Sequence, residues 1–139
     1  MSEPRRHRGL LDTSAVIAMS HTDRSQLPAE IAQSAATLAE LAIGPHATDD
    51  VQEPARRQDH LQRAERTFDP LPFDADAARA YGRVYAAVAA TGRKARGRRA
   101  MDLLIAATAL ALDIPLFTYN PADFEGLDNL IDVVAIDPE

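Results

Sequence analysis

Short apolar runs alternate with longer amphipathic segments along this chain. The short runs are typical of buried strands, because each spans only a few residues and is bounded by polar residues, glycine or proline. They are "GLLD" (9–12), the centre of "AEIAQSA" (29–35), "FDPLPF" (68–73), "IPLFTY" (114–119) and "IDVVAI" (131–136). The segments predicted as helices span residues 13–19, 37–44, 49–67, 75–92 and 100–113.

Capping and breaking residues set the expected ends of these helices. Asp74 is expected to cap the helix over 75–92, and Gly92 to end it. Gly44 and Pro45 form a stop signal after residue 43, and Pro54 is a candidate break in the polar helix over 49–67. The segment over 100–113 is apolar nearly all round, which predicts a central, buried helix.

Strands that alternate with helices indicate an α/β fold with a mostly parallel sheet covered on both faces. No repeat or second domain interrupts the pattern, so residues 1–139 are interpreted as one domain. Ligands bind such sheets beyond the carboxyl ends of the strands. The topology sends several polar residues to that edge, namely Asp12, Glu40, Asp102, Asn120 and Asp123.

Each acidic residue also has a simpler explanation as part of a cap or a turn. Asp12 is a preferred N-cap type, and Thr37 with Glu40 fits a capping box at the start of a helix. Asp102 is a favourable anion near a helix N-terminus, and Asp123 is a common turn residue. Independent caps would not need to converge on one edge of the sheet, and this convergence favours a functional site.

Carboxylates gathered in one partly apolar pocket repel each other unless a cation compensates their charge. Oxygen ligands without cysteine suit Mg²⁺ or Mn²⁺. Such an ion lowers the pKa of a bound water and neutralises a phosphate under attack, and two ions can clamp the attacking and leaving oxygens. The chemistry indicated is metal-assisted hydrolysis of a phosphodiester bond.

The composition excludes several other kinds of site and agrees with metal-assisted hydrolysis. The chain has 139 residues, no cysteine and a formal net charge of −6, so it has neither a disulfide framework nor a thiolate zinc site. The four histidines lack the spacing of a zinc site, and no P-loop or nucleophile-elbow motif is present. No apolar stretch is long enough to span a bilayer or to form a signal peptide, so we expect a cytoplasmic protein.

Basic residues are concentrated in "TGRKARGRR", directly before the segment that carries Asp102. A run of this kind is usually a solvated loop. The alternative is a phosphate-binding patch for RNA on an otherwise acidic protein. Its members are Arg93, Lys94, Arg96, Arg98 and Arg99.

Four blocks of the sequence resemble one known family. They are "LLDTSAVIA" (10–18), "ATLAELAIG" (36–44), "MDLLIAATALALDIPLFTYNPADF" (101–124) and the final strand. In order and spacing they are similar to PIN domains, and more narrowly to the VapC toxins of bacterial VapBC toxin–antitoxin pairs. The resemblance covers essentially the whole chain and implies a three-layer α/β/α fold and a Mg²⁺- or Mn²⁺-dependent endoribonuclease.

The resemblance also implies roles for individual residues. Asp12, Glu40 and Asp102 match the family's first three acidic positions, of which the first and third usually hold the metal. Thr13 and Ser14 match small hydroxyl residues that orient the first carboxylate and a metal-bound water. Either polar site of the block over 118–124 can supply the fourth position. Asn120 is neutral here, so Asp123 is the candidate for the fourth carboxylate. A neutral residue at position 120 would also lower the negative charge of the site and favour one tightly held metal over two.

The partners that the resemblance implies are an RNA substrate and a VapB-like antitoxin whose C-terminal segment covers the acidic groove. A homodimer is also expected, with the helix over 75–92 as a candidate contact, unless Tyr81 and Tyr85 pack in the core. Two other functions stay open. One is a housekeeping PIN nuclease in RNA processing or DNA flap trimming, and the other is a PIN-like module that binds RNA or protein without catalysis.

Overall fold

The computed structural model describes residues 7–47, 53–67, 70–93 and 98–138. Four parallel strands form one sheet in the order β2–β1–β3–β4. The strands are β1 (Arg8–Leu11), β2 (Glu30–Gln33), β3 (Leu116–Thr118) and β4 (Val133–Ala135). All four overlap segments predicted as strands, with β1 beginning one residue earlier than predicted, and the predicted parallel α/β architecture is confirmed.

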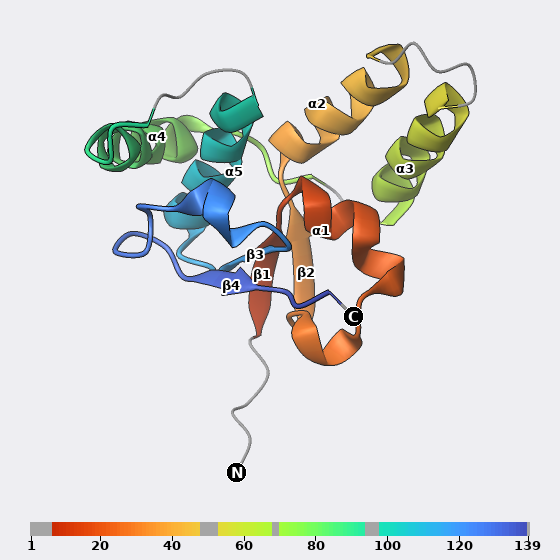
Figure 1. Ribbon diagram of the computed structural model, residues 1–139, viewed down its shortest axis with the longest axis horizontal. Helices are drawn as coiled ribbons and strands as arrows, with labels where there is room; N and C mark the ends of the chain where they lie inside the picture. Colours follow the sequence, from red (N-terminus) through yellow and green to blue (C-terminus); the bar gives the residue numbers. More distant parts are fainter. Residues whose placement is uncertain (1–6, 48–52, 68–69, 94–97, 139) are drawn as a thin grey trace.

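Helices cover the sheet on both of its faces (Figure 1). They are α1 (Thr13–Ala18), α2 (Ala35–Ile43), α3 (Glu53–Thr67), α4 (Ala75–Ala89) and α5 (Arg98–Leu112). In Figure 1 the helices α4 and α5 lie to the left of the strands, whereas α2 and α3 lie to the upper right. Among the described residues, no helix combines the length and the apolar character that a bilayer crossing requires.

Successive strand residues pack into two separate apolar cores, one on each face of the sheet. Leu10 and Leu116 pack with α4 and α5 in the first core. Leu11 and Phe117 pack with apolar residues of α1, α2 and α3 in the second. This alternation follows from the two-residue period of a strand, which sends neighbouring side chains to opposite faces. Because both faces are covered, the carboxyl edge of the sheet is the place left for a ligand.

Helix α5 has the buried position that its apolar sequence predicted. Leu103, Ile105, Ala106, Ala107 and Ala109 are fully buried in the first core. The helix makes its most extensive contacts with α4 and also contacts α2. Asp102 is therefore carried by a helix whose position is fixed by apolar packing.

The strand predicted over residues 68–73 is wrong. Phe68 and Asp69 lie outside the described residues, and the rest of the segment contributes one isolated bridge between Leu71 and Ser34. Leu71 exchanges backbone hydrogen bonds with Gln33 and Ala35. Pro70 and Pro72 flank it, and because proline has no N–H donor, the pairing cannot extend to either side.

The predicted capping box of α2 is also wrong. The helix begins at Ala35, two residues earlier than expected, and its N-cap is Ser34, whose hydroxyl accepts from the backbone N–H of Thr37 at 3.2 Å. Ser34 is buried beside the end of β2, where it makes the bridge to Leu71. Glu40 therefore lies beyond the first turn, and its carboxylate is not needed to cap the helix.

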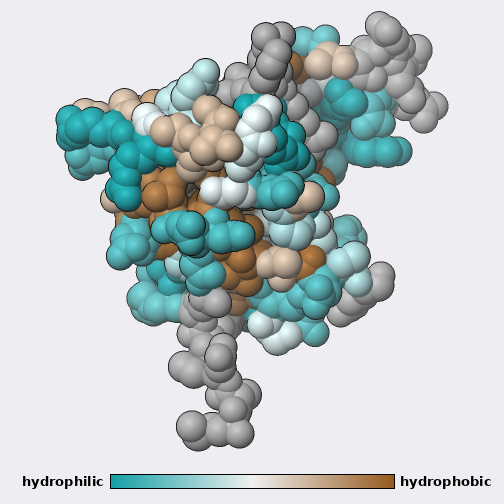
Figure 2. Space-filling view, turned by 60° about the vertical axis from the view of Figure 1, so that its left-hand side comes forward, coloured by the Kyte–Doolittle hydropathy of each residue, from teal (hydrophilic) through white to brown (hydrophobic). Residues whose placement is uncertain are grey.

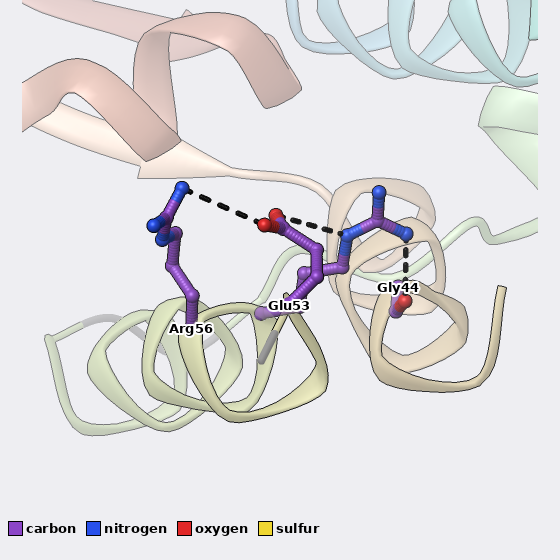
Figure 3. A network of polar contacts seen from close by, with 4 residues as sticks. Gly44, Glu53 and Arg56 are labelled. Carbon is purple, nitrogen blue, oxygen red and sulfur yellow. Dashed lines mark hydrogen bonds and ion pairs between the residues drawn. The ribbon is translucent and has the colours of Figure 1, made fainter. Parts of the chain in front are cut away.

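The polar helix α3 starts at a small charged network rather than breaking at Pro54 (Figure 3). Pro54 is the second helical residue, where the missing N–H has no intrahelical acceptor to lose. Glu53 is 3.4 Å from Arg57 and 3.5 Å from Arg56. Arg57 also donates to the carbonyl oxygen of Gly44 at 2.8 Å, which ties the start of α3 to the end of α2. Residues 49–52 of the predicted helix lie outside the described residues.

Candidate active site at the carboxyl edge of the sheet

Asp12 stands directly after β1, at the point where the sheet ends and α1 begins. Its backbone N–H donates to the carbonyl of Phe117 at 3.0 Å, so the residue is still part of the pairing between β1 and β3. Its side chain caps α1 by accepting from the N–H of Ala15 at 2.9 Å. The capping explanation of Asp12 is therefore correct, but it accounts for only one of the contacts that this carboxylate makes.

Two hydroxyl groups donate to the same carboxylate. Ser14 Oγ donates to Asp12 Oδ1 at 2.6 Å, and Thr118 Oγ1 donates to Asp12 Oδ2 at 2.6 Å. Thr118 is fully buried at the end of β3, and Asp12 itself is only 4% exposed. The carboxylate is thus fixed from α1 and from β3, with its plane and both oxygens defined.

Burial raises the pKa of the Asp12 carboxyl above its ordinary value. Hydrogen bonds from Ser14, Thr118 and the N–H of Ala15 act in the opposite direction and stabilise the ionised form. The negative charge of Asp123 raises the pKa of Asp12 further. This coupling shows that the structure brings Asp123 near Asp12, although the two residues come from opposite ends of the chain.

Glu40 is joined to the same region through Thr13, the residue after Asp12. Thr13 Oγ1 donates to Glu40 Oε1 at 2.8 Å, and it lies 3.1 Å from the hydroxyl of Thr37. Glu40 lies on α2 and Thr13 on α1, so this contact links two helices that start at the carboxyl edge of the sheet. Thr13 and Ser14 therefore have different roles, since the hydroxyl of Ser14 donates to Asp12 whereas that of Thr13 donates to Glu40.

Asn120 and Asp123 follow β3, on the side of β1 away from β2, and Asp102 is carried by α5. Asp102 is half-buried on α5, which begins at Arg98 and thus starts earlier than predicted, so Asp102 is not in its first turn. Asn120 precedes the 3-10 helix η4 (Pro121–Phe124), and its backbone N–H donates to Thr118 Oγ1 at 2.9 Å. Asp123 is half-buried on η4, with its backbone N–H bonded to the carbonyl of Asn120 at 3.0 Å.

The donor set suits a hard divalent cation, because every predicted ligand is a carboxylate. Within the ranges that the structure describes, no three acidic or histidine side chains stand close enough to hold an ion among themselves. Mg²⁺ does not require such a cage, since it is usually bound by one or two carboxylates and keeps several waters. A buried, hydrogen-bonded Asp12 with the charge of Asp123 nearby fits an ion held in that way.

The basic run divides into residues with different surroundings. Arg93 donates to the carbonyl oxygen of Ala122 at 3.0 Å and is 3.6 Å from Glu125, so it ties the segment after α4 to η4. Lys94 and Arg96 lie outside the described residues, as does the side chain of Arg98. Arg99 is half-buried at the start of α5.

A close approach between Gly126, after η4, and Thr91, after α4, adds to the contact between these two segments. Gly126, with a φ of +94°, directly follows Glu125, and a Cβ at this position would lie 2.8 Å from Thr91 Cγ2. Only glycine fits this turn without strain. Arg93 and the turn at Gly126 therefore dock the segment carrying Asp123 against α4.

Three hydroxyl-bearing residues of this site were missed by the sequence reasoning, namely Thr37, Thr118 and Tyr119. Thr118 ends an apolar strand, where a threonine is unremarkable because threonine is common in strands. The signal that could have found it is its place beside Asp12 in a parallel pair, since Leu11 pairs with Phe117. The hydroxyl of Tyr119 bonds that of Thr22, and its N–H donates to Ser14 Oγ at 3.2 Å.

The two tyrosines of α4 occupy different environments. Tyr81 is half-buried against the first core, whereas Tyr85 is 51% exposed. The rings of Phe73, Tyr81 and Tyr85 form a chain of contacts with centroid separations of 6.3 Å. Figure 2 shows apolar side chains gathered across the middle of the face turned forward there, bordered by hydrophilic ones. Core packing thus explains Tyr81 but not Tyr85, and the homodimer stays a prediction.

Comparison with known proteins gives consistent matches. The family model of the PIN domain matches residues 9–130. Ribonuclease VapC5 of Mycobacterium tuberculosis is 36% identical over 133 residues, which cover 92% of this chain and 93% of the relative. A crystal structure of VapBC-5 from Mycobacterium tuberculosis, a member of the VapBC family of toxin–antitoxin systems, matches with a TM-score of 0.77 and 36% identity, over 94% of this chain and 98% of that one. VapBC-1 from nontypeable Haemophilus influenzae matches with a TM-score of 0.66 and 25% identity, over 89% and 95%.

Proposed function

The chain belongs to the PIN domain family, and within it to the VapC proteins; from this premise we propose that it is the toxin of a toxin–antitoxin pair and a metal-dependent endoribonuclease. One relative, 36% identical, is named ribonuclease VapC5, and a matching crystal structure is that of VapBC-5, a member of the VapBC family of toxin–antitoxin systems. The reaction proposed is hydrolysis of RNA phosphodiester bonds. The metal proposed is Mg²⁺ or Mn²⁺.

The observation that carries this proposal is the state of Asp12. A carboxylate that only capped a helix would be exposed at the surface, and its pKa would be lowered by the cap. Asp12 is instead 4% exposed, has a raised pKa and lies beside a second acidic residue. A buried carboxylate of this kind is destabilising without a cation, and its placement at the ligand-binding edge of a parallel sheet favours a catalytic role.

In this proposal Asp12 and Asp102 hold the ion, and Asp123 adds negative charge beside them. When bound, the metal ion activates a water and stabilises charge on the phosphate. Glu40 would accept a proton from a water or orient it, and the hydrogen bond from Thr13 to its Oε1 at 2.8 Å supports this role. Asn120 would contribute a neutral amide where a fourth carboxylate could stand, which favours one tightly held ion.

The proposed protein partner is a VapB-like antitoxin that covers this acidic edge. Support comes from the structural neighbours, whose crystals hold VapBC pairs. An antitoxin that inserts a basic side chain beside Asp12 and Asp123 would compensate the charge that the metal compensates in the active protein. Co-expression with such an antitoxin should therefore relieve any growth arrest caused by the chain.

The proposal is tested by cleavage of RNA with purified protein. Wild-type protein should cut RNA with Mg²⁺ or Mn²⁺, lose this activity in EDTA and regain it when the metal is restored. Asp12→Asn should remain folded and be inactive under all of these conditions. RNA binding without cleavage by wild-type protein at any metal concentration would instead indicate a PIN-like binding module. Cleavage in EDTA equal to that with metal would eliminate the metal mechanism.

A further inference from the structure

Each oxygen of Asp12 is connected through one hydroxyl group to a backbone amide of the loop that follows β3. The N–H of Tyr119 donates to Ser14 Oγ at 3.2 Å, and Ser14 Oγ donates to Asp12 Oδ1. The N–H of Asn120 donates to Thr118 Oγ1 at 2.9 Å, and Thr118 Oγ1 donates to Asp12 Oδ2. The two connections are parallel and run from successive residues of the same loop.

The direction of these hydrogen bonds is fixed by the backbone. An amide N–H can only donate, so each hydroxyl oxygen must accept from it and turn its own hydrogen elsewhere. In both cases the hydroxyl hydrogen points at the Asp12 carboxylate. Each hydroxyl therefore acts as a fixed donor, and the loop position and the carboxylate plane are set together.

Counting acceptor positions shows where the carboxylate is still open. An ionised carboxylate has about four lone-pair positions, two on each oxygen. Oδ1 accepts from both Ser14 and the N–H of Ala15, which fills its two positions. Among the described residues, Oδ2 accepts from Thr118 alone. The remaining position is on Oδ2, and the bond to Thr118 determines which way it points.

We propose that Thr118 is a positioning residue that aims the open lone pair of Asp12 Oδ2 at the metal ion and couples it to the loop leading to Asp123. This inference rests on the proposed metal site and assigns to Thr118 a role separate from that of Ser14. Ser14 occupies the oxygen that α1 already caps, whereas Thr118 occupies the oxygen left for the ion. Residues that orient a ligand in this way affect metal affinity by about 10- to 100-fold.

The test measures binding of Mn²⁺ to metal-free protein by electron paramagnetic resonance, which detects the free ion. Thr118→Val keeps the side-chain shape but removes the donor, and we expect its Mn²⁺ dissociation constant to rise about 10-fold or more. Thr118→Ser should restore most of the affinity, because it keeps the hydroxyl. Thr108→Val is the matched control, since Thr108 is buried too but bonds only the carbonyl of Leu104.

A second readout needs no metal. Loss of the Thr118 hydroxyl leaves the N–H of Asn120 without its acceptor, so this amide should exchange with solvent faster in Thr118→Val than in wild type. If Thr118→Val does not fold, Thr118→Cys takes its place, because a thiol is similar in size and a weak donor. Its affinity should then lie below that of Thr118→Ser.

The outcomes separate this inference from the proposed function. If Asp12→Asn binds Mn²⁺ as well as wild type does, the metal site itself is misplaced. If Asp12→Asn loses binding but Thr118→Val or its Cys substitute binds like wild type, the role of Thr118 is overturned and the metal site stands. Equal losses in Thr118→Val and Thr108→Val would also overturn it, because any buried hydroxyl would then matter equally.

Discussion

Asp123 lies close enough to Asp12 for its charge to raise the pKa of the Asp12 carboxyl, yet the two residues are held in different ways. Asp12 is buried, and both of its oxygens are bonded to groups on α1 and β3. Asp123 is half-buried on the short 3-10 helix η4, which is held by the burial of Phe124 in the first core, by Arg93 and by the turn at Gly126. The Asp12 carboxylate is thus fixed by hydrogen bonds to both of its oxygens, whereas Asp123 is positioned by the packing of the segment that carries it.

This contrast explains why the described carboxylates do not form a closed cage. A cage of fixed, buried carboxylates would be strongly repulsive in the absence of metal. Here Asp12 is buried and hydrogen-bonded, while Asp123 is half-buried and its charge raises the pKa of Asp12. In the proposed site, Asp12 would set the position of the ion and Asp123 would add charge beside it.

The largest expected effect on RNA cleavage is that of replacing Asp12. Asp12→Asn should lower metal-dependent RNA cleavage by more than about 100-fold, because residues that merely orient a metal ligand already contribute 10- to 100-fold in metal affinity or activity. Asp59→Asn on α3 is the control, since that carboxylate is exposed. Cleavage rates with saturating Mn²⁺ and the far-ultraviolet circular dichroism of both variants provide the measurement. Full activity of a folded Asp12→Asn would remove Asp12 from the site.

Asp123 should tolerate substitution better than Asp12. Asp123→Asn is expected to lower cleavage by on the order of 10-fold, and part of this loss should be recovered at higher Mn²⁺ concentration. Asp128→Asn, at an exposed carboxylate of the same region, should change neither the rate nor its metal dependence. A loss for Asp123→Asn as large as that of Asp12→Asn would mean that the two carboxylates contribute equally to the site.

The third test asks whether the basic residues at the start of α5 bind RNA phosphates beside the proposed metal site. If they bind phosphates, the double substitution of Arg98 and Arg99 by Ala should weaken RNA binding and reduce its salt slope by about 0.7 for each lost contact. Mn²⁺ affinity should stay the same. Binding titrations at several salt concentrations give the slope, and an unchanged slope would assign these residues to a solvated segment.

Arg93 is expected to act through structure rather than through RNA. Arg93→Ala removes the hydrogen bond to Ala122 and the contact with Glu125, which should lower the free energy of unfolding by about 1 kcal/mol. Urea unfolding measures this, and Glu125→Gln is the companion variant that removes only the charge. A change in the salt dependence of RNA binding without a change in stability would reverse this assignment.

The last expected effect is the dependence of stability on pH. Because burial raises the folded-state pKa of Asp12 above its ordinary value of 3.8, its ionised form destabilises the metal-free protein. Metal-free Asp12→Asn should therefore be more stable than wild type at neutral pH, by about 1.4 kcal/mol for each unit of pKa elevation. The difference should shrink as the pH falls through the raised pKa of Asp12. Urea unfolding from about pH 4 to pH 7 tests this, and a difference that grows on acidification would contradict it.

The sequence predicted the parts of this protein that local pattern determines. Apolar runs at Leu10–Leu11 and Leu116–Phe117 are strands, and Asp74 caps α4 as expected. The buried position of α5 followed from its apolar composition on all sides. These features depend on residues close together in the chain, which is why the pattern was sufficient.

The errors arose where a contact between distant segments decided the local structure. Ser34 caps α2 in place of Thr37 because the chain leaves β2 at that residue and pairs there with Leu71. Thr118 was missed because its importance comes from Asp12, which lies far away in the sequence. Arg93 looked like part of a basic patch, and its contacts with η4 become visible only in the fold.

The most direct test of the account is to locate the bound ion. Mn²⁺ broadens nuclear magnetic resonance signals from nearby atoms, so a low level of it added to labelled, metal-free protein should broaden the amide signals of Ser14, Ala15 and Asn120 first. Asp12→Asn should show no selective broadening there. The account predicts this pattern because Ser14 and Ala15 bond the Asp12 carboxylate directly and the N–H of Asn120 bonds Thr118 Oγ1, which donates to Asp12 Oδ2. Broadening centred elsewhere, or unchanged in Asp12→Asn, would contradict a metal site built on Asp12.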